Sequence, residues 1–166
     1  MDPVRERSGV VKTSLRVPYC RYIEDSEFER HLAIVRDQVD VSSEIALFTE
    51  YSHRGYWPLG DVEKLVSVLT RRIKAYRDAG FKTVGLNVLD TFGHMDDGWG
   101  DMEDAPMQTF VGMDGRNFRT CLCPSSEEGR EYLAEKFRLL ASCGPDFIWV
   151  DDDFKLKNHG GTEIYK

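Results

Sequence analysis

Three consecutive aspartates, Asp151, Asp152 and Asp153, follow the apolar segment 147–150 and are the residues best placed for acid–base chemistry. In an extended strand, Asp151 and Asp153 share one face and Asp152 lies on the other. Adjacent carboxylates repel each other, so one holds its proton while its neighbour stays ionised. A proton donor beside a carboxylate is what hydrolysis of a glycosidic bond requires. The alternatives are a solvated acidic loop, a helix N-cap or a divalent-metal site.

A second polar group lies in and after the apolar segment 83–89. Asn87 interrupts that segment, where an amide without a partner is costly, so a sugar hydroxyl or a polar group of a neighbouring strand must satisfy it. Asp90 closes the segment, and His94 follows a glycine, which would let its ring approach a ligand closely. The alternative is that Asn87 bonds within the core and His94 is an ordinary loop residue.

A third group combines a carboxylate with aromatic side chains in loops. It consists of Glu50, Tyr51, His53, Tyr56 and Trp57, with Trp99 from a separate loop. Aromatic rings stack on the apolar faces of sugars, and carboxylates accept hydrogen bonds from hydroxyl groups. The sequence therefore predicts carbohydrate binding here, although loop aromatics also cap hydrophobic cores.

The elements that position these groups are short apolar runs, typical of buried strands, alternating with amphipathic helices. The predicted elements are strands over 13–19, 45–49, 83–89 and 147–150, helices over 25–41, 61–79 and 125–143, and a hairpin within 109–123. Ser125 and Glu128 form a capping-box pattern, and Asp25 or Ser26 is expected to cap the first helix. This alternation predicts an α/β fold with a parallel sheet.

Four strands with three helices make half of an eight-stranded barrel. We expect parallel strand–helix repeats that are the first four units of a (β/α)8 barrel, because the long polar loops and the absence of a glycine-rich phosphate loop argue against a flavodoxin-like domain. The predicted organisation is a lead-in over 1–12, a half-barrel domain over 13–160 and a tail over 161–166. In a barrel, Asp151 and Asp153 would point toward the axis.

The segments 147–154 and 158–160, together with Asn87 to His94 and the helix start at Cys123, resemble bacterial glycoside-hydrolase-like TIM barrels. The resemblance implies that an acid/base carboxyl lies at the end of the fourth strand, which places that role on Asp151, Asp152 or Asp153. In such barrels the partner carboxylate often comes from a later strand, so the chain resembles the N-terminal half of the fold.

Composition narrows the range of partners. The net charge is −7 with no basic stripe, which predicts no binding of nucleic acid. No apolar run is long enough to span a bilayer, and the four cysteines form no CxxC pair, so a reduced, cytoplasmic protein without a membrane partner is expected. No motif predicts a cofactor or a bound metal.

Three functions remain open on the sequence. The first is a glycoside hydrolase acting on a carbohydrate substrate, the second is a non-catalytic carbohydrate-binding or interaction domain, and the third is a metal-dependent hydrolase using Asp151, Asp153 and His94. A half-barrel leaves two open sheet edges, so self-association is also expected.

Overall fold

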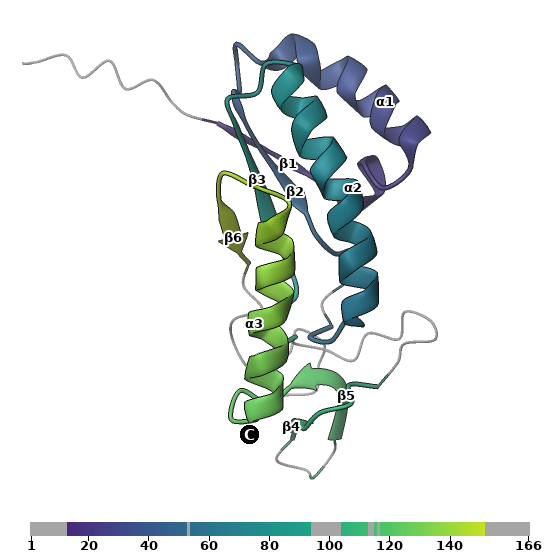
Figure 1. Cartoon of the computed structure of the whole chain (residues 1–166), viewed down its shortest axis with the longest axis vertical. Coiled ribbons are helices and arrows are strands. Elements are labelled where there is room, and N and C mark those ends of the chain that lie inside the picture. The colour runs from purple at the N-terminus through teal and green to yellow at the C-terminus, as the bar shows by residue number, and fades with distance from the viewer. Residues whose placement is uncertain (1–12, 53, 94–103, 113–114, 116, 152–166) are drawn as a thin grey trace, which may run out of the picture.

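The computed structural model describes residues 13–52, 54–93, 104–112, 115 and 117–151. In chain order, its elements are β1 (Ser14–Val17), the 3-10 helix η1 (Tyr19–Arg21), α1 (Asp25–Val35), the 3-10 helix η2 (Arg36–Gln38), β2 (Glu44–Phe48), α2 (Leu59–Asp78), β3 (Thr83–Val88), β4 (Thr109–Val111), β5 (Asn117–Leu122), α3 (Glu127–Ser142) and β6 (Ile148–Val150) (Figure 1). Strands β1, β2, β3 and β6 form one parallel sheet in that order. The predicted α/β fold with a parallel sheet is confirmed.

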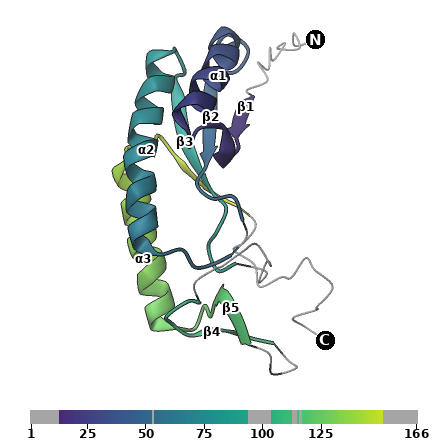
Figure 2. The ribbon, with the colours of Figure 1, turned by 90° about the vertical axis from the view of Figure 1, so that its right-hand side faces the viewer.

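The three helices share one hydrophobic core with one face of this sheet. Alternate strand residues turn to that core: Leu15 and Val17, Ile45 and Leu47, Val84, Leu86 and Val88, and Ile148. Phe28 from α1, Leu69 from α2 and Leu140 from α3 pack against them. Figure 2 shows α2 and α3 together on one side of the strands. The opposite sheet face is therefore left to the residues between these positions, which include Arg16, Asn87 and Trp149.

Glycines permit two close approaches near the sheet. A Cβ atom on Gly85 would lie 2.4 Å from the ring of Phe147, so only glycine lets this ring lie against β3. Gly55 and Gly93 meet in the loops that follow β2 and β3. A Cβ atom on Gly55 would lie 2.1 Å from the carbonyl oxygen of Phe92. These contacts bring the backbone of the loop after β2 directly against the backbone of the loop after β3.

The N-caps of two helices differ from the predicted ones, which were Asp25 or Ser26 for α1 and Ser125 for α3. Helix α1 begins at Asp25 with Glu24 as its N-cap and no side-chain cap, and the Asp25 carboxylate contacts Arg72 of α2. Helix α3 is capped by Ser126, whose Oγ accepts a hydrogen bond from the Gly129 amide at 3.1 Å. The prediction that Ser125 caps this helix is wrong. Both Ser125 and Ser126 are followed by glutamates, so the sequence pattern alone does not show which serine is the N-cap.

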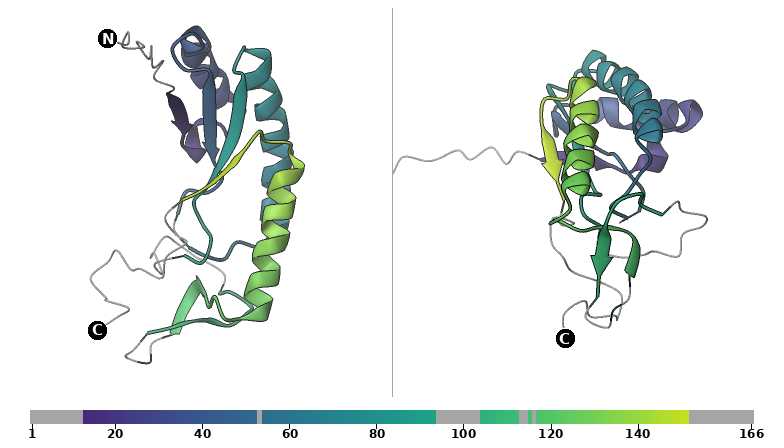
Figure 3. Two further views of the ribbon diagram at one scale, coloured as in Figure 1. Left: turned by 90° about the vertical axis from the view of Figure 1, so that its left-hand side faces the viewer. Right: turned by 60° about the horizontal axis from the view of Figure 1, so that its bottom comes forward.

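The predicted hairpin within 109–123 is confirmed as the antiparallel pair β4–β5. Its turn uses Gly115, with a φ of 78°, whose amide donates to the Gly112 carbonyl oxygen at 2.9 Å. The left view of Figure 3 places this hairpin beyond the carboxyl ends of the sheet strands, beside the first turn of α3. It therefore lies at the end of the molecule where the predicted site residues gather.

Candidate functional site

Arg16, Asn87 and Asp151 form a hydrogen-bonded cluster on the sheet face opposite the helices. Arg16 Nη2 lies 2.6 Å from Asn87 Oδ1 and 2.6 Å from Asp151 Oδ2, and Asn87 Nδ2 donates to Asp151 Oδ2 at 2.9 Å. The cluster joins β1, β3 and the end of β6. Asn87 is fully buried, and its amide is satisfied by polar groups of neighbouring strands, one of the two outcomes that its position predicted.

The strand pattern explains why these three side chains meet. Arg16 alternates with Leu15 and Val17, which face the helices, so its side chain lies on the other face. In the same row of the sheet, β2 carries Ala46, whose small side chain leaves room for a long one, and β3 carries Gly85, over which the ring of Phe147 lies. Arg16 can therefore reach from β1, at one edge of the sheet, to Asp151 at the other.

Aromatic rings flank the cluster. The Arg16 guanidinium lies 4.7 Å from the centre of the Phe48 ring and 5.1 Å from that of Trp149, both on the same sheet face. Such contacts hold the guanidinium in place. The Trp149 side chain remains 47% exposed, which leaves part of the indole open to a ligand.

A pocket of about 370 Å³ opens beside this cluster at the carboxyl ends of β1, β2 and β3. Pro18, Phe48, Tyr51 and Leu89 are among its lining residues. Tyr51 is 57% exposed, and its ring lies 5.5 Å from that of Tyr19. The exposed position of Tyr51 suits the stacking role that the sequence predicted for it.

A second cluster lies behind the strand ends and is fully buried. Lys136 Nζ of α3 lies 2.7 Å from Glu50 Oε1 and donates to the Asp90 carbonyl oxygen at 2.7 Å. Glu50 Oε2 accepts from the Leu89 amide at 3.0 Å, and the indole of Trp57 donates to Asp90 Oδ2 at 2.7 Å. The network fastens the ends of β2 and β3 to α3.

The charge of Lys136 is stabilised where it lies. Burial lowers the pKa of this ammonium group, but the carboxylate of Glu50, with smaller contributions from Tyr132 and Asp90, outweighs burial and raises the pKa above its ordinary value. Lys136 and Glu50 are 1% and 3% exposed, so they form a buried ion pair.

This network changes the surroundings expected for two predicted sugar-binding residues. Glu50 and Asp90 are 3% and 0% exposed and both are bonded to protein groups, and Glu50 is also among the residues that line the strand-end pocket. Trp57, expected as a stacking residue, is 7% exposed and turns its indole inward to Asp90. Its neighbour Tyr56 is half-buried and packs on the Tyr132 ring at 5.2 Å.

Two contributors were missed by the sequence analysis, although each had a visible signal. Arg16 is a charged residue between two apolar strand residues. Lys136 lies four residues after Tyr132 and four before Leu140, so it falls on the buried side of an otherwise apolar helix face. A charge at such a position needs a buried partner.

Several predicted site residues lie outside the part of the chain that the structure describes: Asp152, Asp153, His53, His94 and Trp99. Among the described residues, no group of three or more histidine, cysteine, aspartate or glutamate side chains is arranged to hold a metal ion. No helix of the described part has the length and apolar character needed to cross a membrane.

Comparison with known proteins adds no relative from which to transfer a function. No protein-family model, curated protein sequence or solved structure matches the chain.

Proposed function

We propose that the chain forms the first half of a (β/α)8 barrel and contributes Asp151 to a glycoside hydrolase site at the carboxyl ends of its strands. The observation that carries this proposal is the cluster of Arg16, Asn87 and Asp151, which lies at the strand ends on the face away from the helices. That is the place where (β/α)8 barrels keep their catalytic groups.

The sheet supports the barrel part of the proposal. Its strand order follows the chain, all four strands are parallel, and all three helices pack on one face. A doubly wound sheet instead reverses its strand order and carries helices on both faces. In addition, Arg16 and Asp151 join the two outermost strands across the helix-free face, as side chains do across the concave side of a curved sheet.

Within this proposal, Asp151 acts as the ionised carboxylate of the site. The Arg16 guanidinium 2.6 Å away stabilises its negative charge, which suits a nucleophile or a stabiliser of positive charge on the sugar better than a proton donor. Trp149 and Tyr51 would stack on sugar rings, and Asn87 would keep Asp151 in position. The proton donor would come from Asp153 or from the second half of the barrel.

The test is hydrolysis of a panel of aryl glycosides by the purified chain and by the chain mixed with any protein that completes the barrel. We expect turnover that is lost in Asp151→Asn and retained in Asp78→Asn, an aspartate at the opposite end of the sheet. Turnover that is equal in Asp151→Asn and in the unmodified chain would exclude Asp151 from the chemistry.

A carbohydrate-binding domain without catalysis is the second candidate. The exposed Trp149 favours it, because an indole open to solvent can stack on a sugar ring without any chemistry at Asp151. Calorimetric titration with the same sugars separates the two functions. Binding that requires Trp149, with no hydrolysis of any aryl glycoside, would replace the hydrolase proposal with this one.

The open edges of the sheet lead to a proposal about assembly. Strands β1 and β6 are the outer strands, and Trp149 and Val150 of β6 are 47% and 39% exposed. We propose that the chain associates through these edges, with a second copy or with the remainder of a barrel. Sedimentation equilibrium is the test, and a monomer at all concentrations would count against association with itself.

A further inference from the structure

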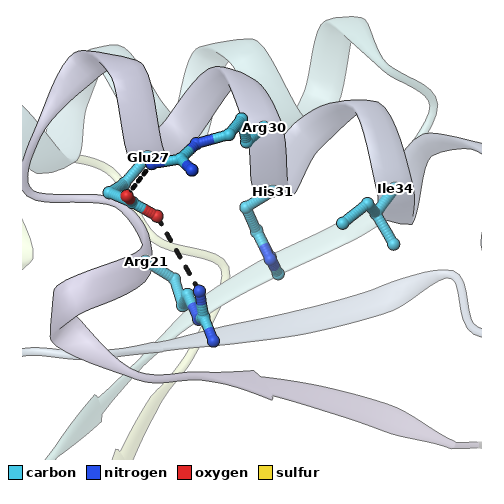
Figure 4. A pocket seen from close by; sticks show the side chains of 5 residues that line it. All are labelled: Arg21, Glu27, Arg30, His31 and Ile34. Carbon is cyan, nitrogen blue, oxygen red and sulfur yellow. Dashed lines mark hydrogen bonds and ion pairs between the residues drawn. The ribbon is translucent and has the colours of Figure 1, made fainter.

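A second surface pocket, of about 360 Å³, lies between η1 and α1, away from the strand-end site. It is lined by Arg21 of η1 and by Glu27, Arg30, His31 and Ile34 of α1 (Figure 4). Its volume falls within the range of small-molecule sites. Glu27, Arg30, His31 and Ile34 share a helix face because they are spaced three or four residues apart.

The pocket carries positive charge in an acidic protein. Two guanidinium groups share one carboxylate: Arg30 contacts Glu27 Oε1, and Arg21 Nη1 lies 3.8 Å from Glu27 Oε2. The second distance is too long for a hydrogen bond, and the Arg21 side chain is 58% exposed. The guanidinium of Arg21 is thus not hydrogen-bonded to Glu27, and it lies in a chain whose net charge is −7.

His31 places an imidazole ring beside these guanidinium groups, among the residues that line the pocket. Its Nε2 atom is buried and has no hydrogen-bond partner among the described residues, although its ring is held edge-on to Tyr76 of α2 at 6.2 Å. A buried ring nitrogen without a partner is costly. Figure 4 shows this ring directed from α1 into the same space as the Arg21 guanidinium.

We propose that this pocket binds a small molecule through an oxyanion group, a phosphate or a carboxylate, held by the guanidinium groups of Arg21 and Arg30 beside the His31 ring. The guanidinium of Arg21 matches the planar arrangement of two oxygens in such a group. The exposed side chain of Ile34 lies at the rim, where it contacts the apolar part of the ligand.

The electrostatics of His31 make the proposal measurable. Burial lowers the pKa of this imidazole, and the charge of Arg21 lowers it further. The charged groups that line the pocket with it are Arg21 from η1 and Glu27 and Arg30 from α1, and Tyr76 faces it from α2. An anion placed between Arg21 and His31 favours the imidazolium form, so binding raises the His31 pKa.

The experiment is an NMR titration of the histidine signals with pH, in sodium sulfate and in sodium chloride of equal ionic strength. Sulfate is the probe because it stays a dianion over the whole range. The His31 signal is assigned by its loss in His31→Gln. We expect sulfate to raise the His31 pKa by about one unit relative to chloride. The shift should be lost in Arg21→Gln and kept in Arg36→Gln, which removes a nearby guanidinium outside the pocket.

Titrations at pH 7.5 with inorganic phosphate and with acetate then distinguish the two ligand chemistries. Tighter binding of phosphate assigns a phosphorylated ligand, and tighter binding of acetate assigns a carboxylated one. Equal responses to sulfate and chloride, or a sulfate response that survives Arg21→Gln, would overturn the proposal. Since Arg21 is exposed, its substitution does not threaten the fold, and an unchanged amide spectrum verifies this.

Discussion

The buried pair of Lys136 and Glu50 offers the sharpest test of how the strand ends are held. Lys136→Met keeps most of the side-chain length but removes the ammonium group that lies 2.7 Å from Glu50 Oε1 and 2.7 Å from the Asp90 carbonyl oxygen. It leaves a buried carboxylate without its countercharge. Breaking a buried ion pair from one side typically costs about 3–5 kcal/mol of unfolding free energy.

This cost is large against the whole stability of a domain, which is of the order of 5–15 kcal/mol. For a chain of this length, 1 kcal/mol corresponds to roughly 2–4 °C in Tm. We therefore expect Lys136→Met to lower the Tm by about 6–20 °C on the same scale. The matched control is Lys74→Met, which removes an exposed ion pair with Asp78 and should change stability by less than about 1 kcal/mol.

A double-mutant cycle separates the ion pair from the loss of packing. Glu50→Gln alone leaves the Lys136 ammonium group buried without its countercharge, whereas the double variant removes both charges. Urea unfolding of the four proteins should give a coupling energy above about 1 kcal/mol, with the double variant more stable than the sum of the single changes predicts. Strict additivity of the two changes would refute the claim that Lys136 and Glu50 act as a pair.

The pH dependence of stability has a definite sign for this pair. The folded-state pKa of Lys136 lies above the unfolded one, so its contribution is fully present below pH of about 10.4 and is lost as pH rises through the folded value. The stability difference between the unmodified chain and Lys136→Met should thus be constant from pH 7 to 9 and shrink in strongly alkaline solution. A difference that grows with pH would contradict the assignment.

Three further changes test other parts of the structure. Gly55→Ala brings a Cβ atom to 2.1 Å from a backbone oxygen and should lower the unfolding free energy, measured in urea, by about 1–3 kcal/mol or more. The control is Gly60→Ala in the first turn of α2, where an added Cβ atom has nothing within 4 Å and should raise the unfolding free energy by up to about 1 kcal/mol. Ser126→Ala should lower the Tm through loss of about 1 kcal/mol of capping energy, and equal loss in Ser125→Ala would show that the cap is misplaced. The Asp146 pKa is lowered by its bond to the Val84 amide and by Arg77, so stability lost in Asp146→Asn at pH 7 should disappear as pH falls below about 4, and a loss independent of pH would refute this.

The elements of the fold were predictable because their signals are local. Buried parallel strands read as apolar runs, and the stripe on α2 is visible at helical spacing, so the order of strands and helices follows from the sequence. Helix caps were less certain, because a serine pair offers two positions for one cap. The side-chain hydrogen bond of Ser126 decides between them only in the folded chain.

The meeting of Asn87 and Asp151 was half predictable. Asn87 lies near the end of one apolar segment and Asp151 directly follows another, and an amide inside an apolar strand requires a partner. The partner's identity depends on which strands are neighbours and on the row each residue occupies. Arg16, 135 residues from Asp151, enters the cluster through that register alone.

The buried network shows the same division between local and tertiary information. Local spacing is enough to show that Glu50 and Asp90 end two apolar strands and that Lys136 lies on the apolar face of a helix. The packing of α3 over those strand ends, where an ammonium group can satisfy a carboxylate and a carbonyl at once, is a property of the folded chain that local spacing does not contain. A carboxylate at a strand end can face solvent, a ligand or a buried countercharge, and the packing of a helix distant in sequence selects among them.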